Sequence, residues 1–241
     1  MSVFPMALLL LGGYVAATIS GAAGFGGALL LLPIASLVVG PREAVPLLTL
    51  AQLVGNLSRA GLGWREIRWR PVLLFSLGAL PASALGAILF ITLPTAAILR
   101  GVGAFLVLMV LLRRTKLKDI RVPEGILVPG GACVGFLSAV VGSAGTLGAL
   151  FFLGLDLPAT AYVASEAVAA VVIHIAKSGI YSSYSLLSGH ILWITALLSI
   201  AMIAGSWTGK RIIETLPKEK FLLVVEALMV VAAASLIVWA R

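Results

Sequence analysis

Long apolar runs separated by short polar connections make up most of this chain. Between residues 71 and 112 the only charged residue is Arg100, and between 157 and 209 the only ones are Glu166 and Lys177. Uncharged apolar runs of this length are typical of helices that cross a lipid bilayer. The pattern predicts about ten apolar segments, at residues 3–19, 22–39, 44–62, 71–91, 95–112, 122–141, 143–156, 159–184, 190–212 and 220–239.

Two of these segments, 22–39 and 143–156, are short or interrupted by glycine. A helix needs about 20 residues to cross the hydrocarbon core of a bilayer. We therefore expect these two segments to form half-helices or re-entrant helices. The remaining segments predict an all-α polytopic membrane protein.

Composition supports a membrane class and excludes several others. Of the 241 residues, 61% are hydrophobic and 11% are charged, whereas a soluble domain carries about 25% charged residues. A single cysteine, Cys133, and two histidines argue against a disulfide framework and a multi-histidine metal centre. We expect no metal and no cofactor. Because no basic residue precedes the first apolar run, we expect that run to stay in the membrane.

The placement of the positive charges predicts topology. The net charge is +8, and the loops 59–70, 113–121 and 210–220 hold most of the lysines and arginines. If every segment crosses, all three loops lie on one side, which the positive-inside rule makes the cytoplasmic side of the cell (inner) membrane. The basic residues therefore indicate a lipid bilayer as the partner and no nucleic acid. A homodimer is left open.

A weak internal repeat divides the chain. Residues 20–27 align with residues 138–145 at a spacing of 118, and Arg59 falls on Lys177 at the same spacing; further along, Gly86 matches Gly209 at a spacing of 123. The first repeat would span residues 1–121, with the cytoplasmic basic loop 113–121, and the second would span 122–241. About five segments in each half make the two repeats inverted, with their broken helices at the interface. Such inverted repeats indicate a secondary transporter.

The two glycine motifs are candidate anion sites. A glycine-rich interruption before a helix exposes free N–H groups at the positive end of the helix dipole, which favours an anion. Close packing of helices is the alternative explanation for such glycines, but their duplication in both halves favours binding. The candidate residues of the two motifs are Gly24, Phe25, Gly26, Gly27, Gly142, Ser143, Gly145 and Thr146.

Polar residues also line one face of two apolar segments. Gln52, Asn56 and Arg59 follow each other at spacings of four and three, and at the repeat spacing Asn56 corresponds to His174 and Arg59 to Lys177. Ionisable groups inside a membrane helix are costly and therefore point to function. We expect these side chains and the two helix N-termini to form one anion-binding pocket.

Glu166 and His174 are the candidates for proton coupling, because both can change charge inside the membrane. Each ionisable residue also has a structural interpretation. Arg59 lies near a basic loop and could reach the lipid headgroups. A structural ion pair is an alternative for Glu166 and Lys177, and a packing role is an alternative for His174.

The order of several motifs resembles one known family. These motifs are the glycines of 24–27 before an apolar run with Pro33, then 41–44, 135–138, 142–145, 155–158 and 205–211. Together they resemble the TauE/SafE family of membrane permeases, also called the sulfite exporter family. The resemblance implies export of a small sulfur-containing anion, either sulfite or an organosulfonate such as sulfoacetate, across the bacterial inner membrane. It also implies functional roles for Gly24, Gly26, Gly27, Gly142 and Gly145.

We therefore expect a secondary transporter that moves this anion by alternating access, with a proton as the candidate coupling ion, and not an enzyme. The chain contains no Walker A motif for ATP. A passive anion channel is an alternative, because the same cationic constriction serves both functions. An intramembrane hydrolase with Ser143 and His174 as a dyad is a weaker alternative, since Ser143 stands one place early for a Gly-x-Ser-Gly motif.

Overall fold

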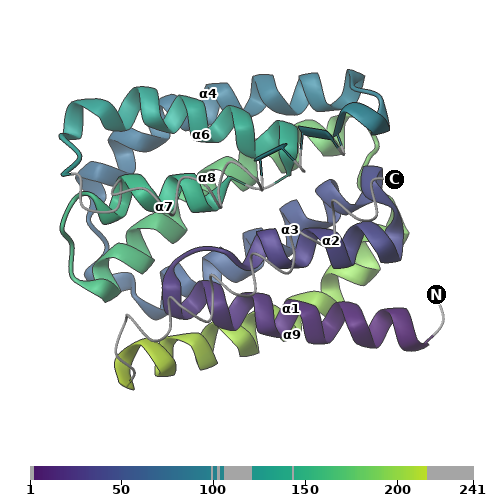
Figure 1. The fold of residues 1–241 in the computed structure, drawn as a ribbon, viewed down its shortest axis with the longest axis horizontal. Helices are drawn as coiled ribbons and strands as arrows, with labels where there is room; N and C mark the ends of the chain where they lie inside the picture. Colours follow the sequence, from purple (N-terminus) through teal and green to yellow (C-terminus); the bar gives the residue numbers. More distant parts are fainter. Residues whose placement is uncertain (1–2, 99, 102–103, 106–120, 143, 216–241) are drawn as a thin grey trace.

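The computed structural model describes residues 3–98, 100, 101, 104, 105, 121–142 and 144–215. The elements assigned in these ranges are all helices (Figure 1), which confirms the all-α class. The predicted segment 95–112 is described only in part, and the segment 220–239 lies outside the described residues. The helices are α1 (Val3–Ala23), α2 (Gly27–Val39), α3 (Pro41–Leu62), η1 (Trp64–Glu66), α4 (Trp69–Thr92), η3 (Glu124–Ile126), α6 (Leu127–Val141), α7 (Gly145–Leu153), α8 (Ala159–Ser183) and α9 (Gly189–Thr215).

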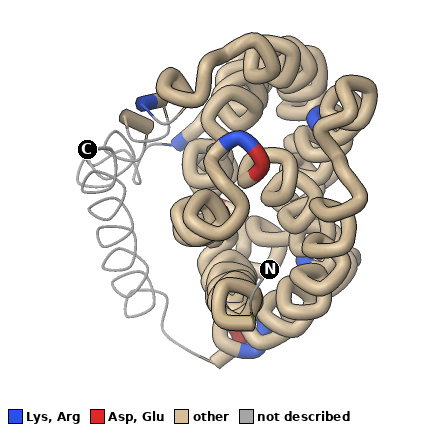
Figure 2. The backbone as a smooth tube through the Cα atoms, turned by 90° about the vertical axis from the view of Figure 1, so that its right-hand side faces the viewer, with Lys and Arg blue, Asp and Glu red and all other residues tan. Residues whose placement is uncertain are grey.

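Five helical stretches of the described chain are long and apolar enough to cross a membrane. They are α1, α4, Glu124–Val141, α8 and α9. Helix α3 is as long as α1, but its 22 residues include the buried polar side chains of Gln52, Asn56 and Arg59. Figure 2 shows how few charged residues interrupt the described helices. The multi-pass membrane class expected from the sequence is thus supported by both length and composition.

Two glycines end α1 and α6 and produce the interruptions that the sequence predicts. Gly24 has φ of +80° and Gly142 has φ of +83°, a left-handed conformation that glycine adopts without steric cost and that commonly terminates helices. The helices that follow are short, with 13 residues in α2 and nine in α7. At 1.5 Å per residue they extend about 20 Å and 14 Å, less than the roughly 30 Å of a hydrocarbon core. Both are therefore half-helices.

The helices pack in pairs around a central group. In Figure 1, α4 and α6 form one edge of the molecule and α1 and α9 form the opposite edge, with α2, α3, α7 and α8 between them. Glycines make the edge pairs possible. A Cβ on Gly209 would lie 2.4 Å from the carbonyl oxygen of Thr18, and a Cβ on Gly86 would lie 2.6 Å from that of Phe136. Small residues allow helix backbones to approach in this way.

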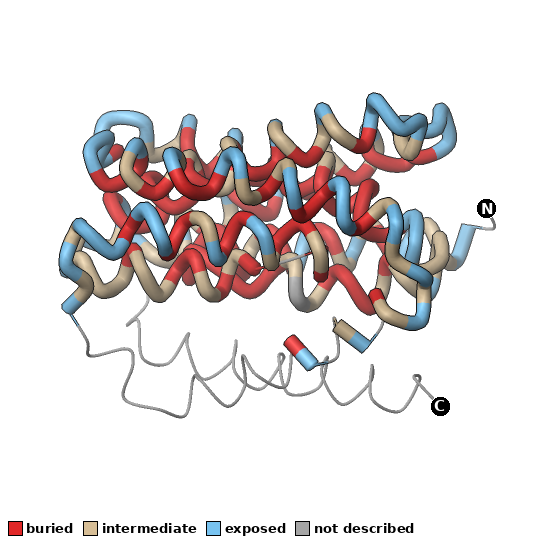
Figure 3. The backbone as a smooth tube through the Cα atoms, turned by 90° about the horizontal axis from the view of Figure 1, so that it is seen from above, coloured by how far each residue is buried: buried red, intermediate tan, exposed pale blue. Residues whose placement is uncertain are grey.

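The core runs along the central helices. Figure 3 shows buried positions inside the bundle and exposed positions on its outer faces and turns. Large apolar side chains such as Leu73, Leu77 and Ile200 are exposed, as expected for faces in contact with lipid. Helix α8 is the most enclosed of the five candidate spans, with 61% of its apolar window buried compared with 33% for α1. Its ionisable side chains Glu166, His174 and Lys177 are all buried.

Candidate functional site

A cavity of about 40 Å³ lies where the two helix breaks meet the polar faces of α3 and α8. Residues of α1, α2, α3, α4, α6, α7 and α8 line it, and we call it the central cavity. Both breaks contribute to its wall, through Gly24 and Gly26 on one side and through Gly142 and Ala144 on the other. The polar and charged side chains in the lining are Ser20, Gln52, Asn56, Arg59, Ser138, Glu166 and His174.

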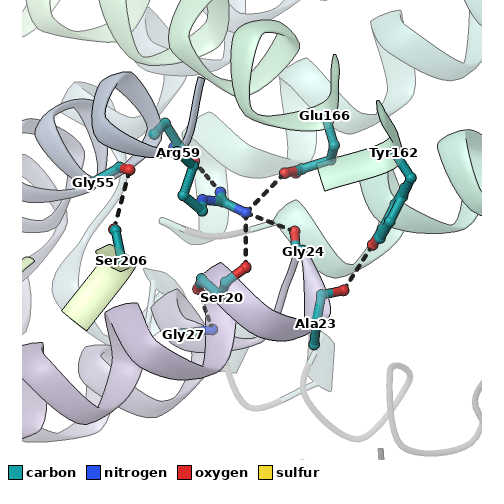
Figure 4. A network of polar contacts seen from close by, with 10 residues as sticks. Ser20, Ala23, Gly24, Gly27, Gly55, Arg59, Tyr162, Glu166 and Ser206 are labelled. Carbon is teal, nitrogen blue, oxygen red and sulfur yellow. Dashed lines mark hydrogen bonds and ion pairs between the residues drawn. The ribbon is translucent and has the colours of Figure 1, made fainter. Parts of the chain in front are cut away.

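Arg59 is the centre of the polar network in this cavity (Figure 4). Its Nη1 atom donates to the carbonyl oxygen of Ser20 at 3.1 Å and to that of Gly24 at 3.0 Å. The same nitrogen lies 3.3 Å from Oε2 of Glu166, and Nη2 donates to the side-chain oxygen of Asn56. The guanidinium thus donates to two carbonyls at the end of α1, of which that of Ser20 also accepts from the N–H of Gly24, and it neutralises a buried carboxylate. The side chain is 6% exposed, so it does not reach the lipid headgroups.

Lys177, which aligns with Arg59 at the sequence spacing of 118, does not line the cavity. Its Nζ atom donates to the carbonyl oxygen of Ser138, at 3.0 Å, and the residue is fully buried. Next to it, Tyr181 donates its hydroxyl to the carbonyl oxygen of Ala139, at 3.2 Å. Lys177 therefore stabilises the C-terminal end of α6, where carbonyl groups have no partner within the helix.

Several buried polar atoms lack a hydrogen-bond partner among the described residues. Three of them belong to the cavity lining, namely Nε2 of Gln52, Nδ1 of His174 and Oε2 of Glu166, which forms the ion pair with Arg59. A fourth is Oγ1 of Thr146, in the first turn of α7. Buried polar groups are nearly always paired, and an unpaired one costs about 1–3 kcal/mol. Unpaired groups directed at a cavity therefore indicate that a polar ligand or water completes them.

The N-terminal ends of the two half-helices differ in their contacts with neighbouring side chains and with the cavity. The N–H of Gly27, at the start of α2, donates to Oγ of Ser20 at 3.0 Å. At the start of α7, Ala144, Gly145 and Gly148 all line the cavity. A helix N-terminus attracts anions through its free N–H groups and its dipole, and the glycines allow a ligand to approach the α7 backbone closely.

A second cavity, of about 30 Å³, is also lined by Arg59, and we call it the side cavity. It is lined by the ends of α3 and α9 and the start of α8, including Gly63, Thr160 and Lys210. Lys210 donates to the carbonyl oxygen of Leu62 at 3.0 Å. Arg59 is therefore shared by the linings of both cavities.

Most residues expected from the sequence to form the pocket are brought together. Gly27, Thr146 and Lys177 do not belong to the lining, and Ser143 lies outside the described residues, so the serine–histidine dyad is not tested. The expected residues that line the central cavity are Gly24, Phe25, Gly26, Gln52, Asn56, Arg59, Gly142, Gly145, Glu166 and His174.

Other lining residues were not predicted. Phe75 of α4 and Phe152 of α7 form an apolar wall, with ring centroids 5.3 Å apart, and nothing in an apolar run distinguishes them from core residues. Ser20 and Ser138 had a signal, because they begin the two stretches that align in the internal repeat. Tyr162 donates to the carbonyl oxygen of Ala23 at 3.0 Å, a long-range contact without a local pattern.

Within the described residues, no group of three or more His, Cys, Asp and Glu side chains is placed to hold a metal ion. The site is therefore described by its cation, its carboxylate, its amides and its helix ends. Such an arrangement can bind a small anion and can exchange a proton at Glu166 or His174.

Comparison with known proteins gives one match. No curated protein and no solved structure matched the chain. The family model described as "Sulfite exporter TauE/SafE" matches residues 9–236, which is nearly the whole length. This chain therefore belongs to the TauE/SafE sulfite exporter family of membrane proteins.

Proposed function

We propose that this protein is a secondary transporter that exports a small sulfur-containing anion through the central cavity by alternating access. One observation carries the proposal: Arg59, two unpartnered buried side chains and the N-terminus of α7 converge on one cavity inside the membrane bundle. A buried cation and free donors favour an anion. Family membership supports a sulfite-type substrate.

The size of the cavity favours the smaller candidate substrate. A site of about 10–15 Å³ holds one water on the same volume scale, so the 40 Å³ of the central cavity accommodates about three waters. Sulfite, a sulfur atom with three oxygens, is close to this size. Sulfoacetate carries an additional acetate group and would require the cavity to widen. We therefore propose sulfite as the main substrate and organosulfonates as secondary ones.

The donors around the cavity fit an oxyanion with several acceptor oxygens. Nε2 of Gln52 is a donor, and Nδ1 of His174 is a donor in one tautomer. Arg59 supplies the positive charge, and the first turn of α7 supplies backbone N–H groups. Lys177 acts indirectly in this proposal, by stabilising the end of α6 through Ser138.

Two inverted repeats, residues 1–121 and 122–241, would provide the two states of such a carrier. The helix contacts support this division, because α1 packs on α9 as α6 packs on α4, and α3 contacts α9 as α8 contacts α4. The close approach of Gly209 to Thr18 and that of Gly86 to Phe136 also occur at positions that the repeat spacings relate. The central cavity would then lie at the interface between the repeats.

The orientation follows from the basic loops. Arg65, Arg68 and Arg70, after α3, are exposed, and the loop 210–220 begins with Lys210 at the end of α9. We propose that these loops face the cytoplasm together with 113–121, most of which lies outside the described residues. The side cavity, lined by Lys210, would then lie on the cytoplasmic side of Arg59.

Flux measurements on purified protein in liposomes test the proposal. Sulfite uptake would be measured at two pH gradients, with sulfoacetate, thiosulfate and sulfate as competitors. We expect saturable sulfite flux that responds to the gradient. Flux that rises linearly with concentration would indicate a channel, and the absence of flux for every sulfur anion would overturn the substrate assignment.

The two histidines of the chain provide a matched pair of variants. His174 lines the central cavity, whereas His190 is exposed at the start of α9. We expect His174→Gln to weaken sulfite binding by about 2- to 12-fold, equivalent to one neutral hydrogen bond. His190→Gln should leave binding unchanged. Equal effects of both substitutions would contradict a site in the central cavity.

A further inference from the structure

Glu166 lies where an incoming anion would bind. Its Oε2 atom is 3.3 Å from Nη1 of Arg59. Its Oε1 atom lies 3.9 Å from the positions that Cβ atoms on Gly145 and Gly148 would occupy, so it faces the first turn of α7. The carboxylate thus spans the guanidinium and the helix N-terminus, the two features that make this cavity suitable for an anion.

The contact between Arg59 and Glu166 is the exchangeable one. The guanidinium also donates to the Ser20 and Gly24 carbonyls, and these bonds stabilise the end of α1. Oε2 of Glu166 is joined to Arg59 by the ion pair at 3.3 Å and has no other hydrogen-bond partner among the described residues. An oxyanion could replace this contact without disturbing the end of α1.

Two anions cannot share this cavity at low cost. Arg59 provides one positive charge in the lining, and Glu166 already neutralises it. A second negative charge in a water-poor site would raise the free energy strongly, as when two carboxylates share a site and one becomes protonated. Substrate binding therefore requires that Glu166 give up its negative charge or its position.

We propose that Glu166 is a tethered competitor that occupies the anion site of the empty transporter and is released from it by protonation. This inference rests on the proposed function and specifies how that site is coupled. One proton from the aqueous phase would bind a carboxylate oxygen of Glu166 as the anion binds Arg59, and it would leave as the anion leaves. Anion and proton would therefore be carried together.

Glu166 has few charged neighbours among the described residues. Of the charged residues on the described parts of the helices that pack against α8, only Arg59 faces it, since Arg42, Glu43 and Arg70 lie at the ends of α3 and α4. The charged residues of η1, Arg65 and Glu66, are exposed.

Four further charged or titratable residues lie in the same region of the structure. Arg68 is exposed, and its backbone N–H donates to Oγ of Ser165 at 2.8 Å. On α8 itself, His174 lines the same cavity, Tyr162 donates to Ala23, and Lys177 donates to Ser138. His174 is therefore the one competing candidate for the coupled proton.

Anion binding to the purified full-length protein at a series of pH values tests the proposal. The probes are sulfite and methanesulfonate, because the charge of methanesulfonate stays constant over the range. For the wild type we expect methanesulfonate affinity to rise as pH falls, approaching about tenfold per pH unit if one proton is taken up per anion. A pH-independent wild-type affinity would overturn the inference.

Glu166→Gln is the decisive variant, because it keeps the shape of the side chain and an oxygen that can accept from Arg59. We expect it to bind methanesulfonate at high pH at least as tightly as the wild type does at low pH, with no dependence on pH. It should also lose proton movement coupled to sulfite flux. Weaker binding in a variant with an unchanged unfolding temperature would indicate that Glu166 is a purely structural partner of Arg59.

Two additional variants separate the remaining explanations. Glu166→Asp should retain the pH dependence, because the acid is preserved. His174→Gln should also retain it, although its affinity is lower; loss of the pH dependence in this variant alone would transfer the coupling role to His174. If the wild type bound neither probe at any pH, the proposed function itself would fail, an outcome distinct from pH-independent binding.

Discussion

The ends of α1 and α6 can be compared residue by residue. At the end of α1, Arg59 donates to the carbonyl oxygen of Ser20, four residues before the left-handed Gly24; at the end of α6, Lys177 donates to that of Ser138, four residues before the left-handed Gly142. The two basic side chains thus perform the same local task. Each donates to a carbonyl in the last turn of a broken helix, and the carbonyl of Ser20 also accepts from the N–H of Gly24 at 2.8 Å.

The difference lies in what each cation contacts beyond that carbonyl. Arg59 also reaches Gly24, Asn56 and Glu166 and lines both cavities, whereas Lys177 lines neither of them. A guanidinium has five donors in a planar fork, while an ammonium is a compact charge with three donors. Arg59 can therefore stabilise a helix end and contact an anion at once.

The space beside the two cations also differs, because a cavity lies next to Arg59 and large side chains lie next to Lys177. Gly63 and Ile213 line the side cavity next to Arg59. At the corresponding repeat positions, next to Lys177, stand Tyr181 and Phe90, both buried and with ring centroids 5.6 Å apart. Two large rings stand at these positions beside Lys177, whereas Gly63 and Ile213 leave a cavity beside Arg59. Positions that align at the repeat spacings thus form an open region beside one cation and a filled region beside the other.

Replacing Arg59 with lysine, the residue type at the aligned position 177, should have the largest effect on sulfite affinity. In Arg59→Lys an ammonium can still satisfy Ser20, but it loses the fork that reaches the cavity. We expect sulfite affinity to fall by about 10- to 150-fold, the equivalent of one charged hydrogen bond of about 1.5–3 kcal/mol. Titration calorimetry on the purified protein measures this. Unchanged affinity would show that the two cations are interchangeable.

Removing the charge of Lys177 should lower the stability of the protein more than it lowers the affinity for sulfite. Lys177→Met introduces a side chain of similar length without a donor. It leaves the Ser138 carbonyl without this hydrogen bond, which should lower the free energy of unfolding by about 1–3 kcal/mol. We expect a lower unfolding temperature in detergent and a sulfite affinity within about threefold of the wild type. A folded variant that no longer bound sulfite would instead make Lys177 a ligand and remove the distinction between the halves.

Two tyrosines allow a smaller test of the same comparison. Tyr162 donates to Ala23 beside the first break, and Tyr181 donates to Ala139 beside the second. Replacing either with phenylalanine should cost about 0.5–1.5 kcal/mol of stability. Only Tyr162→Phe should also alter sulfite affinity, because Ala23 precedes the Gly24 that lines the cavity. Equal affinities in both variants would contradict this prediction.

Much of the fold follows from local patterns. The predicted segments 71–91 and 159–184 correspond to α4 and α8 within two residues at each end, because uncharged apolar runs define membrane helices directly. The two breaks were also predictable, since Gly24 and Gly142 adopt a conformation that favours glycine. The polar face of α3 was predictable from the spacing of Gln52, Asn56 and Arg59.

The partners of the ionisable residues were not predictable. The sequence assigned Arg59 and Lys177 to one anion pocket because they are equivalent in the repeat, yet only Arg59 lines the cavity. The ion pair between Arg59 and Glu166 joins residues on two helices, and no local spacing encodes it. Phe75 and Phe152 line the cavity only because α4 and α7 meet there.

By itself, the sequence determined the membrane class, the placement of most of the described helices, the two interruptions and most of the polar residues inside the bundle. These depend on hydrophobicity and backbone preference, which act over a few neighbouring residues. Only the tertiary structure decided which cation faces the cavity, which residue forms an ion pair with Glu166 and which donors are left unpaired. Those properties depend on distances between helices far apart in the chain, and the free energy of a buried charge is set by the groups that surround it.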